Sequence, residues 1–174
     1  RLVEDSYQYS EQLKSLYPGL KLFTFAESMG GAVALNLSRK YINYYNGCVL
    51  MAPMVKIADE MKQPAIIIKL FILLSRYFPT LPAAPVPDLI HLTFRNQSII
   101  NEIKSRPTRY SRKPRLLTAL TMLNTSLELE SHLNEISIPF LVLHGDYDRV
   151  TDCECSKSLY NLSKSSDKQL KLYS

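Results

Sequence analysis

Short runs of consecutive apolar residues alternate along the chain with longer stretches in which apolar residues recur at helical spacing. Four runs have the length and composition of buried strands: 20–26 (LKLFTFA), 47–53 (GCVLMAP), 139–144 (PFLVLH) and 169–173 (QLKLY). Helical spacing occurs at residues 2–17, 29–39 and 152–163, and Pro18-Gly19 ends the first of these helices. Strands and helices therefore alternate, which predicts a parallel α/β sheet with right-handed crossovers.

The region between residues 54 and 137 interrupts this alternation. It contains helical patterns and prolines, but no run that resembles a buried strand. An insertion of this length between two strands is expected to form a helical cap over the carboxyl ends of the strands. We therefore expect one domain with two core segments, 1–53 and 138–174, and an inserted cap, 54–137.

Two stretches of the expected cap have an uneven distribution of charge. Residues 64–74 (PAIIIKLFILL) are apolar except for Lys69, and Lys62, Lys69 and Arg76 recur every seven residues on one helix face. The run is shorter than the roughly 20 apolar residues that span a bilayer. It suits a helix lying in a membrane interface, and equally a cap helix packed on the domain beneath it. Residues 103–115 carry six Lys or Arg and no acid, which is typical of a solvated face and also suits an anionic lipid headgroup.

Composition and charge exclude some classes of function. The chain has 174 residues, of which 46% are hydrophobic and 21% charged, as in a single globular domain and unlike a disordered or fibrous protein. The net charge of +5 permits attraction to anionic surfaces. No recognition motif or aromatic interleaving accompanies it, so we expect no nucleic-acid partner.

Cysteine usage and the first residues bear on the cellular compartment. Cys48, Cys153 and Cys155 form neither an even set nor a Cys-x-x-Cys pair, so we expect free thiols in a reducing compartment and no zinc site. The chain begins with Arg1 and shows no signal-peptide pattern. We expect a cytoplasmic protein that is not secreted, with peripheral membrane association left open.

The junction of the first strand and its helix carries the most informative motif, Ala26-Glu27-Ser28-Met29-Gly30. A small-x-Ser-x-small sequence between a buried strand and a helix is the context of a nucleophile elbow. The turn is so tight that Ala26 and Gly30 must be small, and the serine hydroxyl is held out at the helix N-terminus. The backbone N–H of Met29 is placed to donate to an oxyanion. A serine that only caps the helix is the simpler alternative.

A serine nucleophile needs a histidine base and a carboxylate that orients it, in the order serine, acid, histidine. Asp146 and Asp148 both lie in the loop after the third strand. Asp148 is the better candidate because it lies further into the loop, whereas Asp146 follows the strand directly and suits a turn. The three histidines, His91, His132 and His144, all precede Asp148, so each is expected to be structural.

Several long, collinear segments carry a resemblance to a known family: FAESMGGAVAL, GCVLMAPMVKIADEMK, KPRLLTALTML, LVLHGDYDRVTD, SKSLY and SSDKQLKLY. Together they resemble the monoacylglycerol lipase family, with its serine aminopeptidase S33-type hydrolase domain, and in particular its plant-type lysophospholipase and caffeoylshikimate esterase-like branch. The resemblance implies an α/β-hydrolase fold with a helical cap that cleaves carboxylic esters through an acyl-enzyme without metal or cofactor. It implies Ser28 as nucleophile, Asp148 as triad acid and Met29 as oxyanion donor.

The chain departs from the family pattern at four points. Ala26 stands where the family has Gly, and Asp146-Tyr147 where it has Glu-Ala; neither change removes a catalytic group. The His-Gly loop that supplies the second oxyanion N–H is expected before Arg1, and the triad histidine a few residues beyond Ser174. We therefore expect a chain truncated at both ends, inactive alone, whose four strands form the C-terminal half of the sheet. The outer edge of the first strand is expected to be bare and to promote association.

The identity of the substrate stays open at this level. Monoacylglycerols or lysophospholipids are the leading hypothesis, because an acyl tail suits a groove beneath a cap. A phenolic ester such as a caffeoyl ester is the alternative within the enzyme class. A truncated, non-catalytic binding module is the alternative outside it, and a weaker hypothesis makes the basic cap a peripheral membrane anchor.

Overall fold

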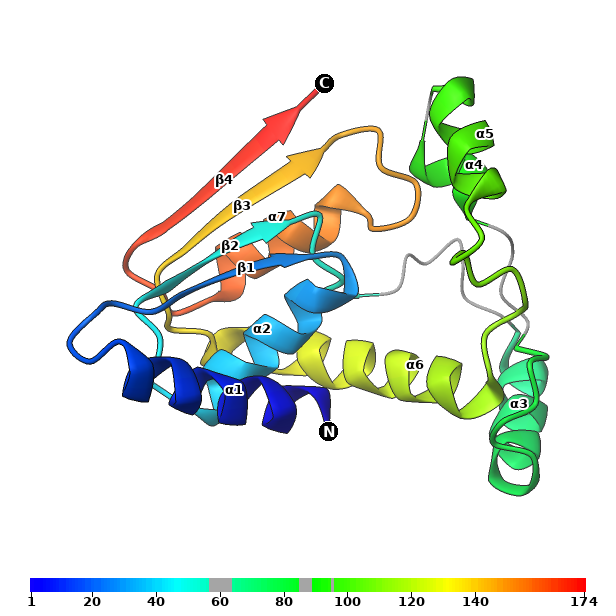
Figure 1. Cartoon of the computed structure of the whole chain (residues 1–174), viewed down its shortest axis with the longest axis horizontal. Coiled ribbons are helices and arrows are strands. Elements are labelled where there is room, and N and C mark those ends of the chain that lie inside the picture. The colour runs from blue at the N-terminus through cyan, green and yellow to red at the C-terminus, as the bar shows by residue number, and fades with distance from the viewer. Residues whose placement is uncertain (57–63, 85–88, 95) are drawn as a thin grey trace.

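A sheet of four parallel strands in the order β1-β2-β3-β4 forms the centre of the computed structural model, which describes residues 1–56, 64–84, 89–94 and 96–174 (Figure 1). The strands are β1 (Phe23–Glu27), β2 (Gly47–Met51), β3 (Phe140–Gly145) and β4 (Lys168–Tyr173). All four runs form strands, with small shifts at their ends. β2 and β3 are largely buried as predicted, whereas no residue of β1 or β4, the two outer strands, is buried. The predicted parallel α/β architecture is also confirmed, because every neighbouring pair of strands is parallel.

Helices connect the strands as the sequence predicts. The core helices are α1 (Leu2–Leu16), α2 (Met29–Lys40) and α7 (Cys153–Leu162). Between β2 and β3 the chain forms α3 (Ala65–Tyr77), α4 (Ile90–Thr93), α5 (Gln97–Ser105), α6 (Leu116–Ser131) and a short 3-10 helix, η2 (Leu133–Glu135). No strand lies between β2 and β3 in the part of the chain that the structure describes. The middle region is thus a helical insertion.

Helices cover one face of the sheet. Ala26, Leu50, Val142 and Leu170 lie in register across the four strands and point to the same face. They pack in one cluster with buried residues of α2, α6, η2 and α7: Ala32, Ala34, Leu35, Leu129, Leu133, Cys155 and Leu159. Alternate positions of each short strand therefore build the main core.

The opposite face of the sheet is left open among the described residues. Phe25, Val49, Leu141 and Gln169 lie in register on this face, and none of them is buried. Phe23 and Phe25 are 60% and 68% exposed. Parallel sheets are normally covered on both faces. Because β1 is also an edge strand, the predicted bare edge of the first strand is confirmed, and the whole face beside it is uncovered as well.

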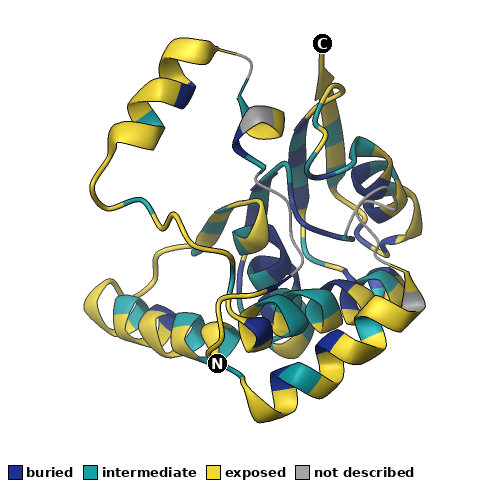
Figure 2. Cartoon of the chain, turned by 90° about the vertical axis from the view of Figure 1, so that its right-hand side faces the viewer, coloured by how far each residue is buried: buried dark blue, intermediate teal, exposed yellow. Residues whose placement is uncertain are grey.

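The inserted helices α3, α4 and α5 lie beyond the carboxyl ends of the strands (Figure 1). A small cluster of Phe71, Ala84 and Leu116 holds α3 against α6, and α5 is exposed around most of its surface (Figure 2). Leu129 near the end of α6 belongs to the main core, so α6 connects the insertion to the sheet. Lys62, the first residue of the expected basic stripe, lies outside the described residues.

Candidate active site

Ser28 occupies a strained turn between β1 and α2. Its backbone has φ 49° and ψ −118°, a conformation that L-residues other than glycine rarely adopt. Such strain costs about 1–3 kcal/mol and persists only where the surrounding structure holds it in place. Ser28 is exposed, although it follows directly on a strand of the sheet.

Backbone hydrogen bonds hold this turn from both sides. The Ser28 N–H donates to the Met51 carbonyl (3.0 Å), which continues the pairing of β1 with β2. The Ser28 carbonyl accepts from the N–H of Gly31 (2.9 Å) and of Met54 (2.8 Å). The loop that leaves β2 therefore fixes the conformation of the serine, and Ala52 in that loop also has a positive φ of 42°.

Two glycines follow the serine, and the structure gives them different roles. A Cβ placed on Gly30 would lie 3.8 Å from the Cβ of Ala26, which is ordinary van der Waals contact. A Cβ placed on Gly31 would lie 2.5 Å from the Cβ and 2.8 Å from the Cα of Pro53. The tightest contact of the elbow is therefore between α2 and the β2 exit loop. Sequence reasoning missed it, because Pro53 gives no local signal of this contact.

Alanine substitutions distinguish these two glycines. Gly31→Ala is expected to destabilise the protein by about 1–3 kcal/mol, because Pro53 backbone must move to admit the methyl group. Gly30→Ala has room for its methyl group and gains helix propensity, so we expect a change below about 1 kcal/mol. Urea unfolding of the two variants measures the difference. Equal free energies of unfolding would show that the close approach of Gly31 to Pro53 is not a constraint.

Met29 is the first residue of α2, and its side chain is 42% exposed. The first N–H groups of a helix have no intrahelical acceptor, and the helix dipole favours negative charge at this end. The Met29 N–H therefore lies beside the serine with the polarity that an oxyanion requires.

Asp148 lies in the loop after β3, and its carboxylate organises that loop. Oδ1 accepts hydrogen bonds from the N–H groups of Val150 (2.7 Å) and Thr151 (3.0 Å), and Oδ2 accepts from the Thr151 hydroxyl (2.8 Å). A carboxylate oxygen accepts two hydrogen bonds, so Oδ2 keeps capacity for one more N–H donor. Asp146 in the same loop is exposed, and no hydrogen bond to its carboxylate is found among the described residues.

The environment of Asp148 favours its ionised form. Burial raises the pKa of this carboxyl group, but the His144 side chain beside it and the hydrogen bonds from Thr151 and Val150 outweigh burial. They hold the pKa of Asp148 well below its usual range. The group is therefore a fixed, oriented carboxylate at neutral pH.

His144 is buried in β3 with both ring nitrogens occupied. Nε2 lies 2.8 Å from the Thr151 carbonyl, so it carries the proton and donates, while Nδ1 lies 2.7 Å from the Ser156 hydroxyl. The same Nε2 is 3.6 Å from Oδ2 of Asp148, too far for a good hydrogen bond. With 2% of its surface exposed, His144 supports the acid loop and does not face solvent.

The other histidines lie in the inserted region. His132 follows α6, and its Nδ1 lies 2.7 Å from the Glu128 carbonyl. His91 belongs to α4, and its side chain lies outside the described atoms. The described contacts of His132 and His144 are those of structural residues, in line with the sequence-based expectation.

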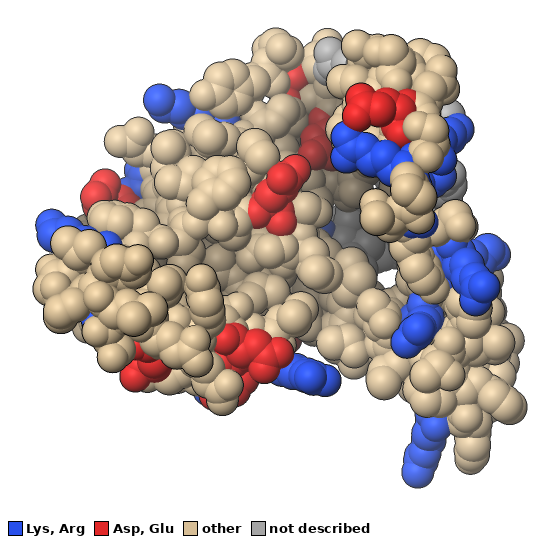
Figure 3. Space-filling model, in the orientation of Figure 1, with Lys and Arg blue, Asp and Glu red and all other residues tan. Residues whose placement is uncertain are grey.

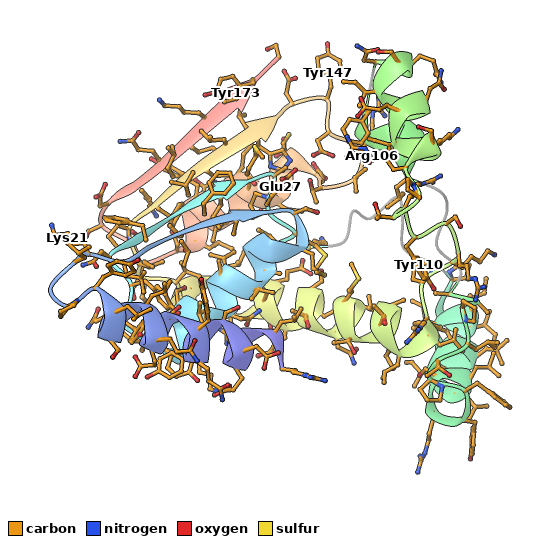
Figure 4. The ribbon with its side chains drawn as sticks, in the orientation of Figure 1. Lys21, Glu27, Arg106, Tyr110, Tyr147 and Tyr173 are labelled. Carbon is orange, nitrogen blue, oxygen red and sulfur yellow. The ribbon has the colours of Figure 1, made fainter. Side chains whose placement is uncertain are left out.

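The elbow and the acid loop lie at the same end of the sheet. Glu27, Met51 and Leu143 are in register, so Ser28 follows β1 at the level where the acid loop leaves β3. The two strands are separated by β2 alone, which corresponds to about 10 Å. Figure 4 shows Glu27 and Tyr147 at this end of the sheet, on the side of the cap residue Arg106. The sheet therefore brings the elbow and the acid loop to the same edge.

Thiol and metal chemistry have little support at this site. None of the three cysteines, all of which lie in the described part of the chain, forms a disulfide. Burial raises the pKa of the Cys48 thiol to about 12. Burial also raises the pKa of Cys153 in the first turn of α7. No cluster of three or more His, Cys, Asp or Glu side chains suited to a metal is found in residues 1–56, 64–84, 89–94 and 96–174. Ser28 is thus the candidate nucleophile.

Comparisons with known proteins identify the family to which the chain is similar. The model of a family described as serine aminopeptidase, S33, matches residues 1–174. Human monoglyceride lipase is 29% identical over 171 residues, which are 98% of this chain and 55% of that protein. Caffeoylshikimate esterase from Arabidopsis thaliana is 31% identical over 158 residues, 90% of this chain and 48% of that protein. The chain thus spans about half the length of these curated relatives.

Solved structures share the fold. The monoacylglycerol lipase of Paleococcus ferrophilus superposes with a TM-score of 0.79 at 23% identity, covering 98% of this chain and 65% of that one. A soluble variant of monoglyceride lipase from Saccharomyces cerevisiae, in complex with a substrate analogue, gives a TM-score of 0.80 at 19% identity, covering 98% and 59%. At these identities the likeness establishes the α/β-hydrolase fold.

Proposed function

The chain belongs to the serine aminopeptidase S33 family as a monoglyceride lipase-like α/β-hydrolase, and from this we propose that it carries the nucleophile and acid of a carboxylic-ester hydrolase. The substrates are monoacylglycerols or lysophospholipids, and the reaction passes through an acyl-enzyme. Ser28 attacks the ester carbonyl, the Met29 N–H stabilises the oxyanion, and Asp148 orients the base. No metal or cofactor takes part.

The strained backbone of Ser28 is the observation that carries this proposal. A serine that merely caps a helix has no need of φ 49°, because ordinary cap residues lie in the β-region. The same residue makes no side-chain cap hydrogen bond to α2. Strain that exposes an unpaired hydroxyl at a helix N-terminus is typical of a nucleophile elbow.

We further propose that the base is not one of the histidines in these 174 residues. His144 is buried and its ring nitrogens already have partners. His91 lies in α4, and His132 lies between α6 and η2, both in the inserted region. A serine without its base is a weak nucleophile. The 174 residues alone are therefore expected to show negligible esterase turnover.

Labelling with a fluorophosphonate probe tests two proposals: that Ser28 is a nucleophile, and that the 174 residues lack the base that activates it. The probe reacts covalently with an activated serine. We expect no labelling of the 174-residue chain and strong labelling of any longer form of the protein that the gene encodes. Ser28→Ala is expected to abolish that labelling, whereas Ser158→Ala, at an exposed serine of α7, is expected to keep it.

Different outcomes would contradict the absence of the base and the hydrolase function. Labelling of the 174-residue chain at Ser28 would contradict the absence of the base. If a longer, folded form also stays unlabelled, the hydrolase function is wrong, and a non-catalytic binding module that retains the fold takes its place.

A phenolic ester is the second candidate substrate, supported by the 31% identity to the Arabidopsis caffeoylshikimate esterase. The two candidates differ in the acyl group that must fit beneath the cap. Turnover of a monoacylglycerol, a lysophospholipid and a caffeoyl ester, measured without the probe on the form of the protein that reacts with it, ranks the substrates directly. A higher kcat/KM for the caffeoyl ester would favour the second candidate.

Helix α3 supports a contact of the cap with a membrane surface. Ile66, Leu70, Leu73 and Tyr77 form one stripe at helical spacing and are 73%, 54%, 54% and 68% exposed. Lys69 and Arg76 flank this stripe, while the opposite side of the helix packs through Phe71. We propose that the stripe lies in the lipid interface. Among the described residues, no helix is long and apolar enough to cross a membrane.

A further inference from the structure

A hollow opens in the cap, away from the elbow, where two segments of the chain run side by side. The Ala84 N–H donates to the Pro114 carbonyl (3.2 Å), and the Leu116 N–H donates to the Leu81 carbonyl (3.0 Å). These bonds tie the turn after α3 to the loop before α6. Between them lies a cavity of about 290 Å³, lined by Thr80, Pro82, Arg109, Tyr110, Ser111, Arg112 and Arg115.

The charged side chains that line the hollow are basic. Three guanidinium groups line it, and no acidic residue does among those that the structure describes. Arg112 and Arg115 form no ion pair within the described part of the chain, in contrast to Arg106 nearby, which pairs with Glu102 at 2.6 Å. Figure 3 shows Lys and Arg side chains gathered on this side of the molecule, where α3 and the segment after α5 lie. Arg112 and Arg115 therefore bring to the hollow positive charge that no acidic side chain among the described residues neutralises.

The donors around the hollow match one kind of anion. Guanidinium groups present planar pairs of N–H donors, which suit the oxygens of a phosphate group. The hydroxyls of Thr80 and Ser111 add neutral donors. The Tyr110 hydroxyl donates instead to the Lys113 carbonyl (3.2 Å), which closes the loop that carries the arginines. The hollow thus offers guanidinium and hydroxyl donors, and no carboxylate is among its described lining residues.

We propose that this hollow binds a phosphate group, with Arg112 and Arg115 as its principal ligands. The group belongs either to the headgroup of a membrane phospholipid or to a soluble phosphate ester. The neighbouring surface supports the phospholipid source. Tyr77 at the end of α3, and Phe78 and Leu81 in the turn after it, are 68%, 56% and 44% exposed. An apolar surface beside a phosphate site suits a lipid, and this part of the proposal rests on the proposed membrane contact of α3.

Titration of the protein with inorganic phosphate, at constant ionic strength, tests the site. We expect saturable binding that weakens at least about tenfold in the Arg112→Gln/Arg115→Gln variant, because charge-assisted hydrogen bonds are lost. Lys113→Gln, which removes a charge from the same loop but not from the lining, is expected to change the affinity less than about twofold. Neither variant removes a backbone hydrogen bond of the loop.

Vesicles distinguish the two sources of the phosphate. For a lipid source, vesicles of phosphatidylcholine with phosphatidic acid bind more tightly than vesicles with a fatty acid at equal surface charge, and the double arginine variant loses that difference. For a soluble source, the two kinds of vesicle bind equally although inorganic phosphate binds saturably. The absence of saturable phosphate binding, or equal losses in the arginine and Lys113→Gln variants, would overturn the proposal.

A variant of α3 in the same assays tests the phosphate site independently of the proposed membrane contact. Leu70→Ser/Leu73→Ser is expected to weaken binding to both kinds of vesicle and to leave inorganic phosphate binding unchanged. If that variant binds vesicles as the unaltered protein does, the membrane contact of α3 is wrong while the phosphate site stands on its own titration. Because the readout is binding, it is also valid in the Ser28→Ala protein.

Discussion

Asp148→Asn is expected to lower kcat about 10⁴-fold in the form of the protein that turns over esters. The amide keeps one oxygen for the Val150 and Thr151 N–H groups, so the loop retains its shape. At the other position it offers an NH₂ group where the base requires an acceptor, and the histidine is then held in the wrong tautomer. The loss is therefore one of orientation and charge, without unfolding.

Asp146→Asn is the matched control for this prediction. It makes the same chemical change two residues away, at an exposed carboxylate. We expect its kcat to stay within about threefold of the unaltered enzyme, since an exposed charge is screened by solvent. The opposite result, a large loss for Asp146→Asn and a small one for Asp148→Asn, would assign the triad acid to Asp146.

The pH dependence of the free energy of unfolding is a second test of the environment of the Asp148 carboxylate. Its pKa in the folded chain is held well below its usual value of about 3.9. The ionised group therefore stabilises the fold above about pH 4, and this contribution is lost as the pH falls below that value. The difference in free energy of unfolding between the unaltered protein and Asp148→Asn is expected to be largest near neutral pH and to shrink in acid.

The 174-residue chain is expected to self-associate through the uncovered face of its sheet. Phe23 and Phe25 stand on that face in the edge strand β1, with 60% and 68% of their surfaces exposed. Burying a phenylalanine side chain contributes about 1.5–3 kcal/mol, and the edge adds unpaired backbone groups that pair with another strand. Gel filtration with light scattering at increasing concentration measures this association.

Threonine at both positions is expected to shift the chain toward monomer, since it keeps strand propensity and removes the apolar rings. Tyr9→Thr removes an aromatic ring that is 62% exposed on α1, away from the sheet, and is expected to leave association unchanged. A monomeric peak for the unaltered chain at all concentrations, with cooperative unfolding, would show that the face is not a site of association.

Local pattern determined much of this protein. Runs of apolar residues marked β1 to β4, and helical spacing marked α1, α2, α3 and α7, because both periods are set by backbone geometry within a few residues. The elbow around Ser28 was readable for the same reason, since the strand, the turn and the helix are contiguous in sequence. The free cysteines and the helical nature of the insertion also followed from composition and pattern.

Contacts between distant segments were decided only by the tertiary structure. The steric requirement at Gly31 comes from Pro53, and the hollow in the cap comes from residues 80–82 lying beside residues 109–115. Pro53 and residues 109–115 reach these positions through the path of the chain in three dimensions. The periodicity of side chains along the sequence does not encode that path. Likewise, Phe23 and Phe25 belong to a run that predicts a buried strand, and only the position of β1 at the edge of the sheet, with helices on one face, leaves their rings exposed.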